Sequence, residues 1–371
     1  MNVRKTIYCT VTNDLNQDQR MHRICSSLTK IGYEVCLVGR IKPSSPTLLD
    51  MPFRQIRLRC FFNKGFLFYA EYNMRLLIFL LFRVNPDIIY SVDTDTLPAC
   101  GLAKRLKSKK MVFDAHEYFT EVPEVIHRPF VKWIWQMIEK NFIPMADECI
   151  TVNQSLADLF SKKYDKPFIP IYNVPEKSEK HKAVKSDIKP YLLYQGMLNY
   201  GRGLEELMAA MPYINDMNLI IIGEGDISEK LKRLANESPA KDRIRFTGWL
   251  KPDDIKVITA GATLGINLLE PGSKSYYFSL ANKFFDYMHA EVPSVNMDFP
   301  EYRAIISKHG VGLLISDLDK NEIADKINLL LSDHEKYSSM KSACRTACDM
   351  YNWDHEEKKL GKLMESLSER T

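Results

Sequence analysis

The sequence lacks the short motifs that identify several classes of nucleotide-binding protein. No Gly-x-x-x-x-Gly-Lys-Ser/Thr loop is present, which argues against a P-loop nucleotidase. No Gly-x-Gly-x-x-Gly follows the first predicted strand, which argues against a dinucleotide-dependent dehydrogenase. No Cys-x-x-Cys pair occurs, and no nearby histidine gives Cys344 and Cys348 a zinc-binding spacing. We expect the eight cysteines to be reduced thiols of a cytoplasmic protein.

A strong excess of one charge sign is also missing. The 371 residues contain 51 Lys and Arg and 47 Asp and Glu, and a net charge of +4 is too small to indicate nucleic-acid binding. Residues 1–175 hold 24 basic and 17 acidic side chains, a balance of +7. This half is therefore the better candidate to meet an anionic partner, although ordinary scatter explains the imbalance equally well.

No apolar run reaches the roughly 20 residues with which a helix spans a bilayer. The nearest candidate, residues 65–82, is interrupted by Glu71, Asn73 and Arg75. We expect a buried helix here, and a helix lying in a membrane surface is the alternative.

Short apolar runs alternate with segments of helical periodicity along the chain, a pattern typical of doubly wound parallel sheets. In the first half, strands are predicted at 6–11, 35–38, 87–91, 111–113 and 148–152, and helices at 18–31, 97–106 and 131–142. In the second half, strands are predicted at 191–194, 218–222, 244–246, 264–268 and 294–296, and helices at 203–211, 227–235, 253–259, 282–287, 321–332 and 335–348. The polar segment between the halves, with five lysines, reads as a linker.

Two acidic clusters follow predicted strands of the first half, at the edge where such sheets bind ligands. Asp93-Thr94-Asp95 has a form that holds a divalent cation in some sugar transferases, but acidic residues also favour the first turn of a helix, and we expect no metal. In Asp114-Ala115-His116-Glu117, the histidine could donate a hydrogen bond to a hydroxyl or stabilise charge in a transition state. The alternative is a capping cluster with a satisfied histidine.

Two loops of the second half have the composition of an anion-binding site. Residues 194–203 contain three glycines and Arg202 ahead of a helix, and this combination allows close backbone approach to a phosphate and its bidentate binding. Residues 268–288 run from a strand into a helix opened by Asn282. Amides at the start of this helix could meet a diphosphate, and Asp286 could accept bonds from two vicinal hydroxyls. A flexible loop with a solvent-facing arginine is the alternative for residues 194–203.

Taken together, four segments resemble family 4 glycosyltransferases of the GT-B fold, and the resemblance covers nearly the whole chain. The segments are Asn13-Asp14 with Asp18 and Arg20, Asp93-Thr94-Asp95-Thr96-Leu97-Pro98, Asp114-Ala115-His116-Glu117, and Leu280-Ala281-Asn282-Lys283-Phe284-Phe285-Asp286-Tyr287-Met288. The resemblance implies an α/β chain with two Rossmann-like domains, 1–173 and 190–354, that face a central cleft. Residues 174–189 would link them, and 355–371 would form a C-terminal helix packing back on the first domain.

The resemblance also implies a role for each segment. His116 would approach the donor sugar and assist transfer, while Asn13, Asp14 and Asp93 would lie on the acceptor side. The implied donor-binding residues are Gly196, Arg202, Leu280, Asn282, Lys283 and Asp286, with Trp249 or Leu250 near the base. The donor would be a nucleotide sugar, a UDP- or GDP-sugar, used without a metal or other cofactor and with retention of anomeric configuration.

Four positions depart from the family pattern. Asp286 replaces the second glutamate of the paired-glutamate motif, and Phe278 stands where the first would be. Met197 occupies a position that is often basic, and Glu291 occupies a turn position that is usually glycine. Because a glutamate with positive φ is strained, we expect a different turn at Glu291.

The sequence therefore predicts a retaining glycosyltransferase that moves a sugar from a nucleotide-diphosphate donor to a hydroxyl of a glycan or lipid-linked acceptor in cell-surface polysaccharide assembly. The basic first half and the aromatic stretches at 61–72 and 133–135 suggest a cytoplasmic enzyme at the inner face of the membrane. Two alternatives stay open: a nucleotide-sugar epimerase on the same fold, and a non-catalytic nucleotide-sugar-binding subunit.

Overall fold

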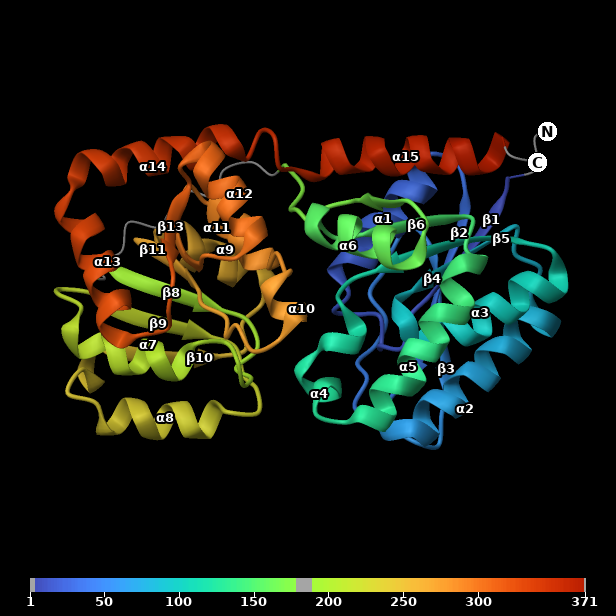
Figure 1. The fold of residues 1–371 in the computed structure, drawn as a ribbon, viewed down its shortest axis with the longest axis horizontal. Coiled ribbons are helices and arrows are strands. Elements are labelled where there is room, and N and C mark those ends of the chain that lie inside the picture. Colours follow the sequence, from blue (N-terminus) through green and yellow to red (C-terminus); the bar gives the residue numbers. More distant parts are fainter. Residues whose placement is uncertain (1–3, 178–188, 370–371) are drawn as a thin grey trace. The chain divides into compact units, whose positions relative to one another are not determined.

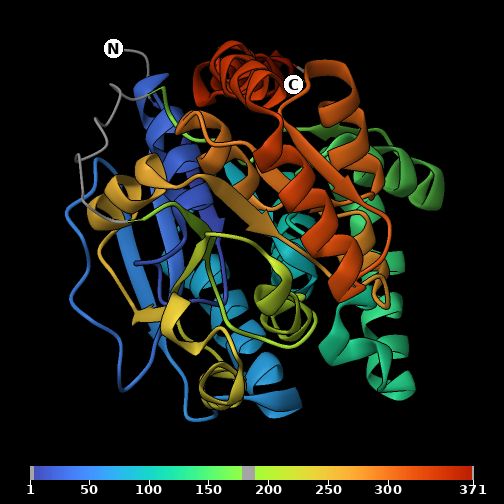
Figure 2. The same cartoon turned by 90° about the vertical axis from the view of Figure 1, so that its left-hand side faces the viewer.

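The computed structural model describes residues 4–177 and 189–369, and the chain divides into two compact units. Unit 1 comprises Met1–Asn173 and Glu356–Thr371, and unit 2 comprises Val174–His355. Each unit is a parallel sheet with helices on both faces (Figures 1 and 2). Most of the predicted linker, residues 178–188, lies outside the described residues.

The sheet of unit 1 has seven strands in the order β3-β2-β1-β4-β5-β6-β7. The strands are β1 (Thr6–Thr10), β2 (Glu34–Ile41), β3 (Arg54–Arg59), β4 (Ile88–Val92), β5 (Lys110–Ala115), β6 (Glu148–Thr151) and β7 (Phe168–Pro170). The helices are α1 (Gln19–Lys30), α2 (Gly65–Ile78) with its π-helical continuation η1 (Phe79–Arg83), α3 (Asp93–Lys107), α4 (Pro123–Ile126), α5 (Pro129–Phe142), α6 (Gln154–Tyr164) and α15 (Trp353–Glu369). The sequence prediction missed β3, β7, α4 and α6.

The sheet of unit 2 has six strands in the order β10-β9-β8-β11-β12-β13. The strands are β8 (Tyr191–Gln195), β9 (Asn218–Ile222), β10 (Ile244–Gly248), β11 (Leu264–Asn267), β12 (Ser294–Met297) and β13 (Gly312–Ile315). The helices are α7 (Leu204–Ala210), α8 (Ser228–Glu237), α9 (Pro252–Gly261), α10 (Lys274–Tyr277), α11 (Asn282–His289), α12 (Pro300–His309), α13 (Lys320–Ser332) and α14 (His334–Ala347). Here the prediction missed α10, α12 and β13.

Strand order reverses once in each sheet, and the candidate residues follow the strands at that point. In unit 1 the chain builds outward from β1 to β3 and then returns to β4 on the other side of β1, and in unit 2 it does the same between β8 and β11. At such a reversal the loops leave the sheet in opposite directions, so ligands bind at the carboxyl ends of these strands. Asp93 follows β4 and Gly196 follows β8.

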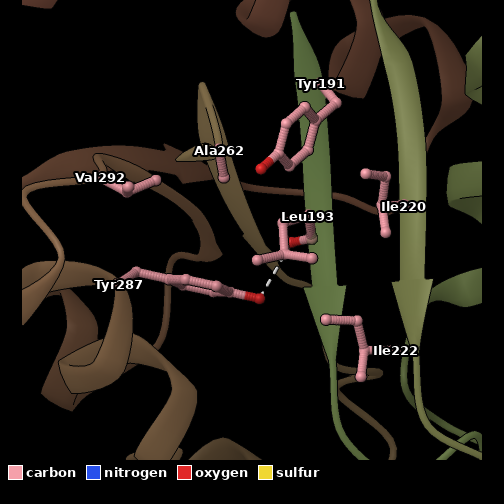
Figure 3. Packing of buried hydrophobic residues seen from close by; sticks show 7 residues of the cluster. All are labelled: Tyr191, Leu193, Ile220, Ile222, Ala262, Tyr287 and Val292. Carbon is pink, nitrogen blue, oxygen red and sulfur yellow. Dashed lines mark hydrogen bonds between the residues drawn. The ribbon is translucent and has the colours of Figure 1, made fainter. Parts of the chain in front are cut away.

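A buried cluster fixes helix α11 to the sheet of unit 2 (Figure 3). The fully buried Tyr287 donates a hydrogen bond from its hydroxyl to the carbonyl of Leu193, at 2.9 Å. A Cβ atom at Gly265 of β11 would lie 2.2 Å from the Tyr287 ring, so only glycine lets the helix approach this closely. The same helix carries Lys283 and Asp286, so this packing sets the position of both.

The apolar segment at 65–82 is not the buried helix that was predicted. Phe68, Tyr72, Leu76 and Leu80 form its buried side, but 28% of its most apolar 18-residue window is buried. Among the described residues, Gly65–Arg83 is the one helix long and apolar enough to cross a membrane, judged by length and composition only. The prediction is therefore wrong for the outer side of this helix.

Candidate active site

Asp114 is the centre of a buried network at the carboxyl end of β5. Arg20 of α1 binds it with two donors, Nε to Oδ2 at 3.1 Å and Nη2 to Oδ1 at 2.9 Å. The Tyr90 hydroxyl donates to Oδ2 at 2.9 Å, and His116 Nε2 lies 3.1 Å from the same oxygen. Burial opposes ionisation of Asp114, but Arg20 and His116 outweigh it and hold the pKa of this carboxyl well below its usual range. Asp114 is therefore a permanent anion beneath His116.

His116 is held between two carboxyl groups. Its backbone N–H donates to Asp93 Oδ1 at 2.8 Å, and its Nδ1 lies 3.7 Å from Asp93 Oδ2. Burial alone would lower the pKa of His116, but Asp114 and Asp93 raise it to about 9. The ring is thus an imidazolium at neutral pH. Its Nε2–H group donates to Asp114, so the Nδ1–H group is the one that can donate to a ligand. This arrangement suits a hydrogen-bond donor and not a general base.

The predicted acceptor-side residues lie at the same edge of the sheet as His116, because β1, β4 and β5 are neighbours. Asp93 opens α3 with φ of 53°, an uncommon conformation for a residue other than glycine. Burial raises its pKa, and His116 opposes that rise. Asn13 and Asp14 make local contacts: Asn13 Nδ2 donates to Asp18 Oδ2 at 2.7 Å, and Asp14 accepts from the Ser45 hydroxyl at 3.3 Å.

Asp95 points to a different neighbour from Asp93. Its Oδ2 accepts from the Thr12 hydroxyl at 2.6 Å, and burial raises its pKa to about 6. Within the described residues, no group of three or more His, Cys, Asp or Glu side chains could hold a metal ion.

In unit 2, Lys283 and Arg202 bring two positive charges to the glycine loop after β8. The Lys283 ammonium lies 3.7 Å from the centre of the Tyr194 ring, and a Cβ at Gly196 would be 3.4 Å from Nζ. Gly196 has φ of 132°, which only glycine adopts readily, so the loop presents bare backbone beside the ammonium. Arg202 stacks over the Tyr276 ring at 5.0 Å, and its buried Nε has no hydrogen-bond partner in the described chain.

No carboxylate of the described residues lies within ion-pair distance of Lys283 or Arg202. Burial and the neighbouring Arg202 lower the pKa of Lys283 well below its usual value, and Asp286 only partly opposes this. The charged form of this half-buried lysine is therefore disfavoured, and a bound anion would stabilise it. The pair is therefore arranged to receive a phosphate group.

Asp286 lies one turn after Lys283, and the structure gives it a partner that the sequence did not suggest. Gln195 Nε2 donates to Asp286 Oδ2 at 3.0 Å, while Gln195 Oε1 accepts from the Thr259 hydroxyl at 2.8 Å. This chain of bonds orients the carboxylate at the carboxyl end of β8. The strand-end position of Gln195 was the available signal for its role.

The remaining predicted donor residues differ in their surroundings. Leu280 is buried and Asn282 is exposed, on either side of Ala281, whose N–H donates to the Tyr302 hydroxyl at 2.9 Å. That amide is therefore already occupied. Trp249 and Leu250 follow β10: Trp249 is 59% exposed, and Leu250 packs against the cluster of Figure 3.

The positions that depart from the family pattern have defined environments. Phe278 ends the short helix α10 and stacks edge-on against Tyr277 at 5.1 Å, and Met197 is exposed. Glu291 keeps the left-handed turn, with φ of 59°, so the prediction of a different turn is wrong. Arg345 binds its carboxylate with two donors, at 2.7 and 3.0 Å, which offsets the strain.

Sequence reasoning did not identify the partners of these groups. It assigned no role to Tyr90, Tyr194, Tyr276 or Gln195, and it did not pair Arg20 with Asp114, because contacts between residues 94 positions apart leave no local pattern. A signal was available only for Tyr194 and Gln195, which lie at the end of the apolar strand β8.

Two family models match consecutive parts of the chain. Residues 17–175 match the family described as glycosyltransferase family 4, and residues 176–347 match the one described as glycosyl transferases group 1. Among curated proteins, the chain is 25% identical to the chitobiosyldiphosphodolichol beta-mannosyltransferase of Candida albicans, over 92% of this chain and 84% of that protein. It is 23% identical to a GDP-mannose-dependent alpha-(1-6)-phosphatidylinositol monomannoside mannosyltransferase of Mycobacterium tuberculosis, over 51% of this chain and 50% of that protein.

Solved structures share the fold at low sequence identity. A sucrose-phosphate synthase from Thermosynechococcus elongatus superposes with a TM-score of 0.84 at 17% identity, over 99% of this chain and all of the other. Anabaena HepE in complex with UDP-glucose gives a TM-score of 0.76 at 14% identity, over 97% and 99%. WaaG, a glycosyltransferase involved in lipopolysaccharide biosynthesis, gives 0.72 at 14%, over 96% and 99%.

Proposed function

The chain belongs to the family 4 glycosyltransferases of the GT-B fold, and from that premise we propose that it transfers a sugar from a UDP- or GDP-sugar to a hydroxyl of a glycan or lipid-linked acceptor in cell-surface polysaccharide assembly. The main support for a donor-binding site is the pair of basic residues Lys283 and Arg202, which have no ion-pair partner among the described residues and lie beside the backbone of Gly196. This pair matches the charge of a diphosphate. Asp286, oriented by Gln195, accepts from the ribose hydroxyls.

In the proposed reaction the acceptor oxygen attacks the anomeric carbon as the bond from that carbon to the diphosphate breaks. The acceptor proton passes to the departing phosphate oxygen, and the new bond forms on the face that the diphosphate leaves. Lys283 and Arg202 stabilise the charge that develops on the diphosphate, which is electrostatic catalysis that needs no divalent cation. His116 contributes a charged Nδ1–H donor to the sugar and takes no proton from the acceptor.

The names of two relatives support a nucleotide-sugar donor and a lipid-linked acceptor. One names GDP-mannose as donor and a phosphatidylinositol monomannoside, and the other names chitobiosyldiphosphodolichol. We propose by extension a cytoplasmic enzyme at the inner membrane face. One relative's name specifies a β-linkage and the other an α-linkage, so the product anomer is a necessary readout.

The test begins with a thermal-shift panel of nucleotides and nucleotide sugars, because ligand binding to the native state raises the melting temperature. With the donor so identified, Arg202→Ala and Asp286→Ala should each lower transfer at least tenfold, while Arg233→Ala, an exposed arginine on α8, serves as the matched control. Activity should survive chelation of divalent cations, and the product should keep the anomeric configuration of the donor by nuclear magnetic resonance.

Three outcomes would contradict the proposal. Transfer unchanged in both active-site variants would remove the assigned donor site. Isomerisation of the donor without an acceptor would indicate an epimerase. Donor binding without turnover, with any acceptor of a glycan and lipid-linked panel, would indicate a non-catalytic nucleotide-sugar-binding subunit.

A further inference from the structure

The outer side of α2 and η1 carries an uninterrupted apolar stripe. Phe66, Ala70, Met74, Ile78 and Phe82 follow one another at intervals of four residues, and all five are exposed. Each residue at this spacing lies about one turn beyond the one before it, so the five side chains form a continuous row along the exposed surface of the helix. Phe66 and Phe82, at its two ends, are 70% and 78% exposed. No residue classed as exposed between Gly65 and Phe82 has a polar side chain.

The opposite side of this helix is built into unit 1, so the stripe cannot turn inward. Phe68, Tyr72 and Leu76 are buried, and the Tyr72 hydroxyl donates to the carbonyl of Val11. Asn73 Nδ2 donates to the carbonyl of Asp95 at 2.8 Å, and its Oδ1 accepts from the Ala99 N–H at 3.1 Å. These bonds fix the rotation of the helix about its axis and keep the stripe facing away from the sheet.

The loop before α2 presents two more aromatic side chains, and Glu71 fastens it. Phe61 is 83% exposed, and Phe62 is also exposed. The buried Glu71 carboxylate accepts from the backbone N–H groups of both, at 2.9 to 3.0 Å, and from Arg75 Nε at 2.7 Å. A buried carboxylate thus holds two phenylalanines in the solvent, an arrangement that costs stability unless the rings meet an apolar partner.

Helix α5 continues the apolar surface. The α2, α3 and α5 helices lie on one side of the sheet of unit 1 (Figure 1), with α3 packed against both others and Tyr69 of α2 touching Trp135 of α5 at 5.1 Å between ring centres. Phe130 and Trp133 of α5 are 72% and 56% exposed and stack on each other at 6.0 Å. We call the stripe, together with Phe61, Phe62, Phe130 and Trp133, the apolar docking face.

The exposed charges on the helices that form this face have one sign, while the exposed Glu124 of the neighbouring α4 and Asp87 after η1 are acidic. Every acidic residue of α2, η1, α3 and α5 is covered, and the exposed charged residues of these helices are Arg83, Arg105 and Lys140. Lys64 and Arg128, which directly precede α2 and α5, are exposed too. Aromatic and aliphatic side chains on helices whose exposed charges are basic match an anionic lipid surface, in which rings enter the headgroup boundary and bases meet the phosphates.

From this geometry we infer that the apolar docking face binds the surface of an anionic lipid bilayer, with α2 and η1 lying in the plane of the interface. The proposed function includes an acceptor at the membrane, and the inference identifies the surface of unit 1 that would meet that membrane. It rests on the proposed function for its biological meaning. Its physical content is independent, because vesicle binding needs neither donor nor transfer. The helix lies on the membrane and does not cross it, since its inner side is bonded into unit 1.

The experiment uses the full-length chain and sedimentation with two kinds of vesicle, one of phosphatidylcholine alone and one also containing phosphatidylglycerol. The parent protein should bind the anionic vesicles at about 50 mM salt and be released at about 0.5 M, because salt screens the exposed basic residues. Phe66→Ser with Phe82→Ser should lower the partition coefficient at least tenfold. Leu329→Ser with Met350→Ser, two exposed apolar residues of unit 2, is the matched control and should bind as the parent does.

All three proteins should show the same thermal shift with a nucleotide sugar, so loss of vesicle binding is distinguishable from failure of the donor site. The inference is overturned if the parent stays in solution with anionic vesicles at low salt, or if the Phe66 and Phe82 variant binds as tightly as the parent. A dimer by light scattering that these substitutions dissociate would make the face an interface between copies. Resistance to extraction by alkaline carbonate would make the helix a membrane span.

Discussion

Replacing Lys283 with methionine should separate stability from ligand binding. Methionine keeps an unbranched apolar stem of similar length and removes the ammonium, which in the free protein has no carboxylate partner among the described residues and lies near Arg202. The loss of the contact with Tyr194 costs about 0.5–2 kcal/mol, because the Tyr194 ring is buried. The relief of an uncompensated charge offsets it. The free energy of unfolding without ligand should therefore be equal to that of the parent or higher, whereas an average substitution lowers it by about 1 kcal/mol.

Binding of the nucleotide sugar should change in the opposite direction. A charge-assisted hydrogen bond to phosphate contributes about 1.5–3 kcal/mol, so the dissociation constant should rise roughly 10- to 100-fold. Urea denaturation without ligand measures the first quantity, and a thermal-shift titration with the donor measures the second. Lys326→Met, at an exposed lysine of α13, is the control and should change neither.

Either of two results would refute this reasoning. A loss of more than about 2 kcal/mol of unfolding free energy without ligand would mean that the Lys283 ammonium is a structural group. Unchanged donor affinity would mean that the diphosphate binds elsewhere. The combination of retained stability and lost affinity is expected of a group placed for a ligand, because a structural cation would lose both together.

Three other predictions follow from the geometry of each unit. The pKa of His116 is raised from 6.5 to about 9, so its contribution to stability is complete below about pH 6.5 and is lost as the pH rises through 9; His116→Gln should flatten this alkaline decline in urea melts. Gly265→Ala places a Cβ 2.2 Å from the Tyr287 ring and should lower the unfolding free energy by about 1–3 kcal/mol, while Gly272→Ala, with nothing within 4 Å, should leave it unchanged. Glu291→Gly removes about 1–2 kcal/mol of left-handed strain against a surface ion pair of about 1 kcal/mol or less, so it should match or exceed the parent in melting temperature, and Glu291→Ala should fall below both.

Much of the fold could be predicted from the sequence, because buried parallel strands are short apolar runs that stand out from helical periodicity. The strands that were missed lie at or near sheet edges. β3 alternates arginines with apolar residues because one side of it meets solvent, and β7 has three residues. These strands have too few buried apolar residues to be recognised from the sequence before the neighbouring strand is known.

The sequence predicted which residues form the candidate site, but it did not predict which of them contact one another. The motif around His116 indicated a ligand-facing histidine, but its charge depends on Asp93 and on the Arg20 pairing of Asp114, which only the folded sheet brings together. The apolar segment at 65–82 shows the same limit in another form. Its polar residues Glu71, Asn73 and Arg75 are buried or half-buried and its exposed side is apolar, so composition pointed to the wrong side as the covered one.

The division of the chain has a consequence for how the protein is made. Unit 1 contains residues from both sides of unit 2, and the returning segment from Glu356 buries Leu360, Leu363 and Met364. The Glu356 carboxylate also accepts from the Tyr172 N–H at 3.0 Å. During translation, all of unit 2 is therefore synthesised before the C-terminal segment of unit 1. The unit that begins first is thus completed last, and the apolar surface against which Leu360 and Met364 pack stays uncovered until then.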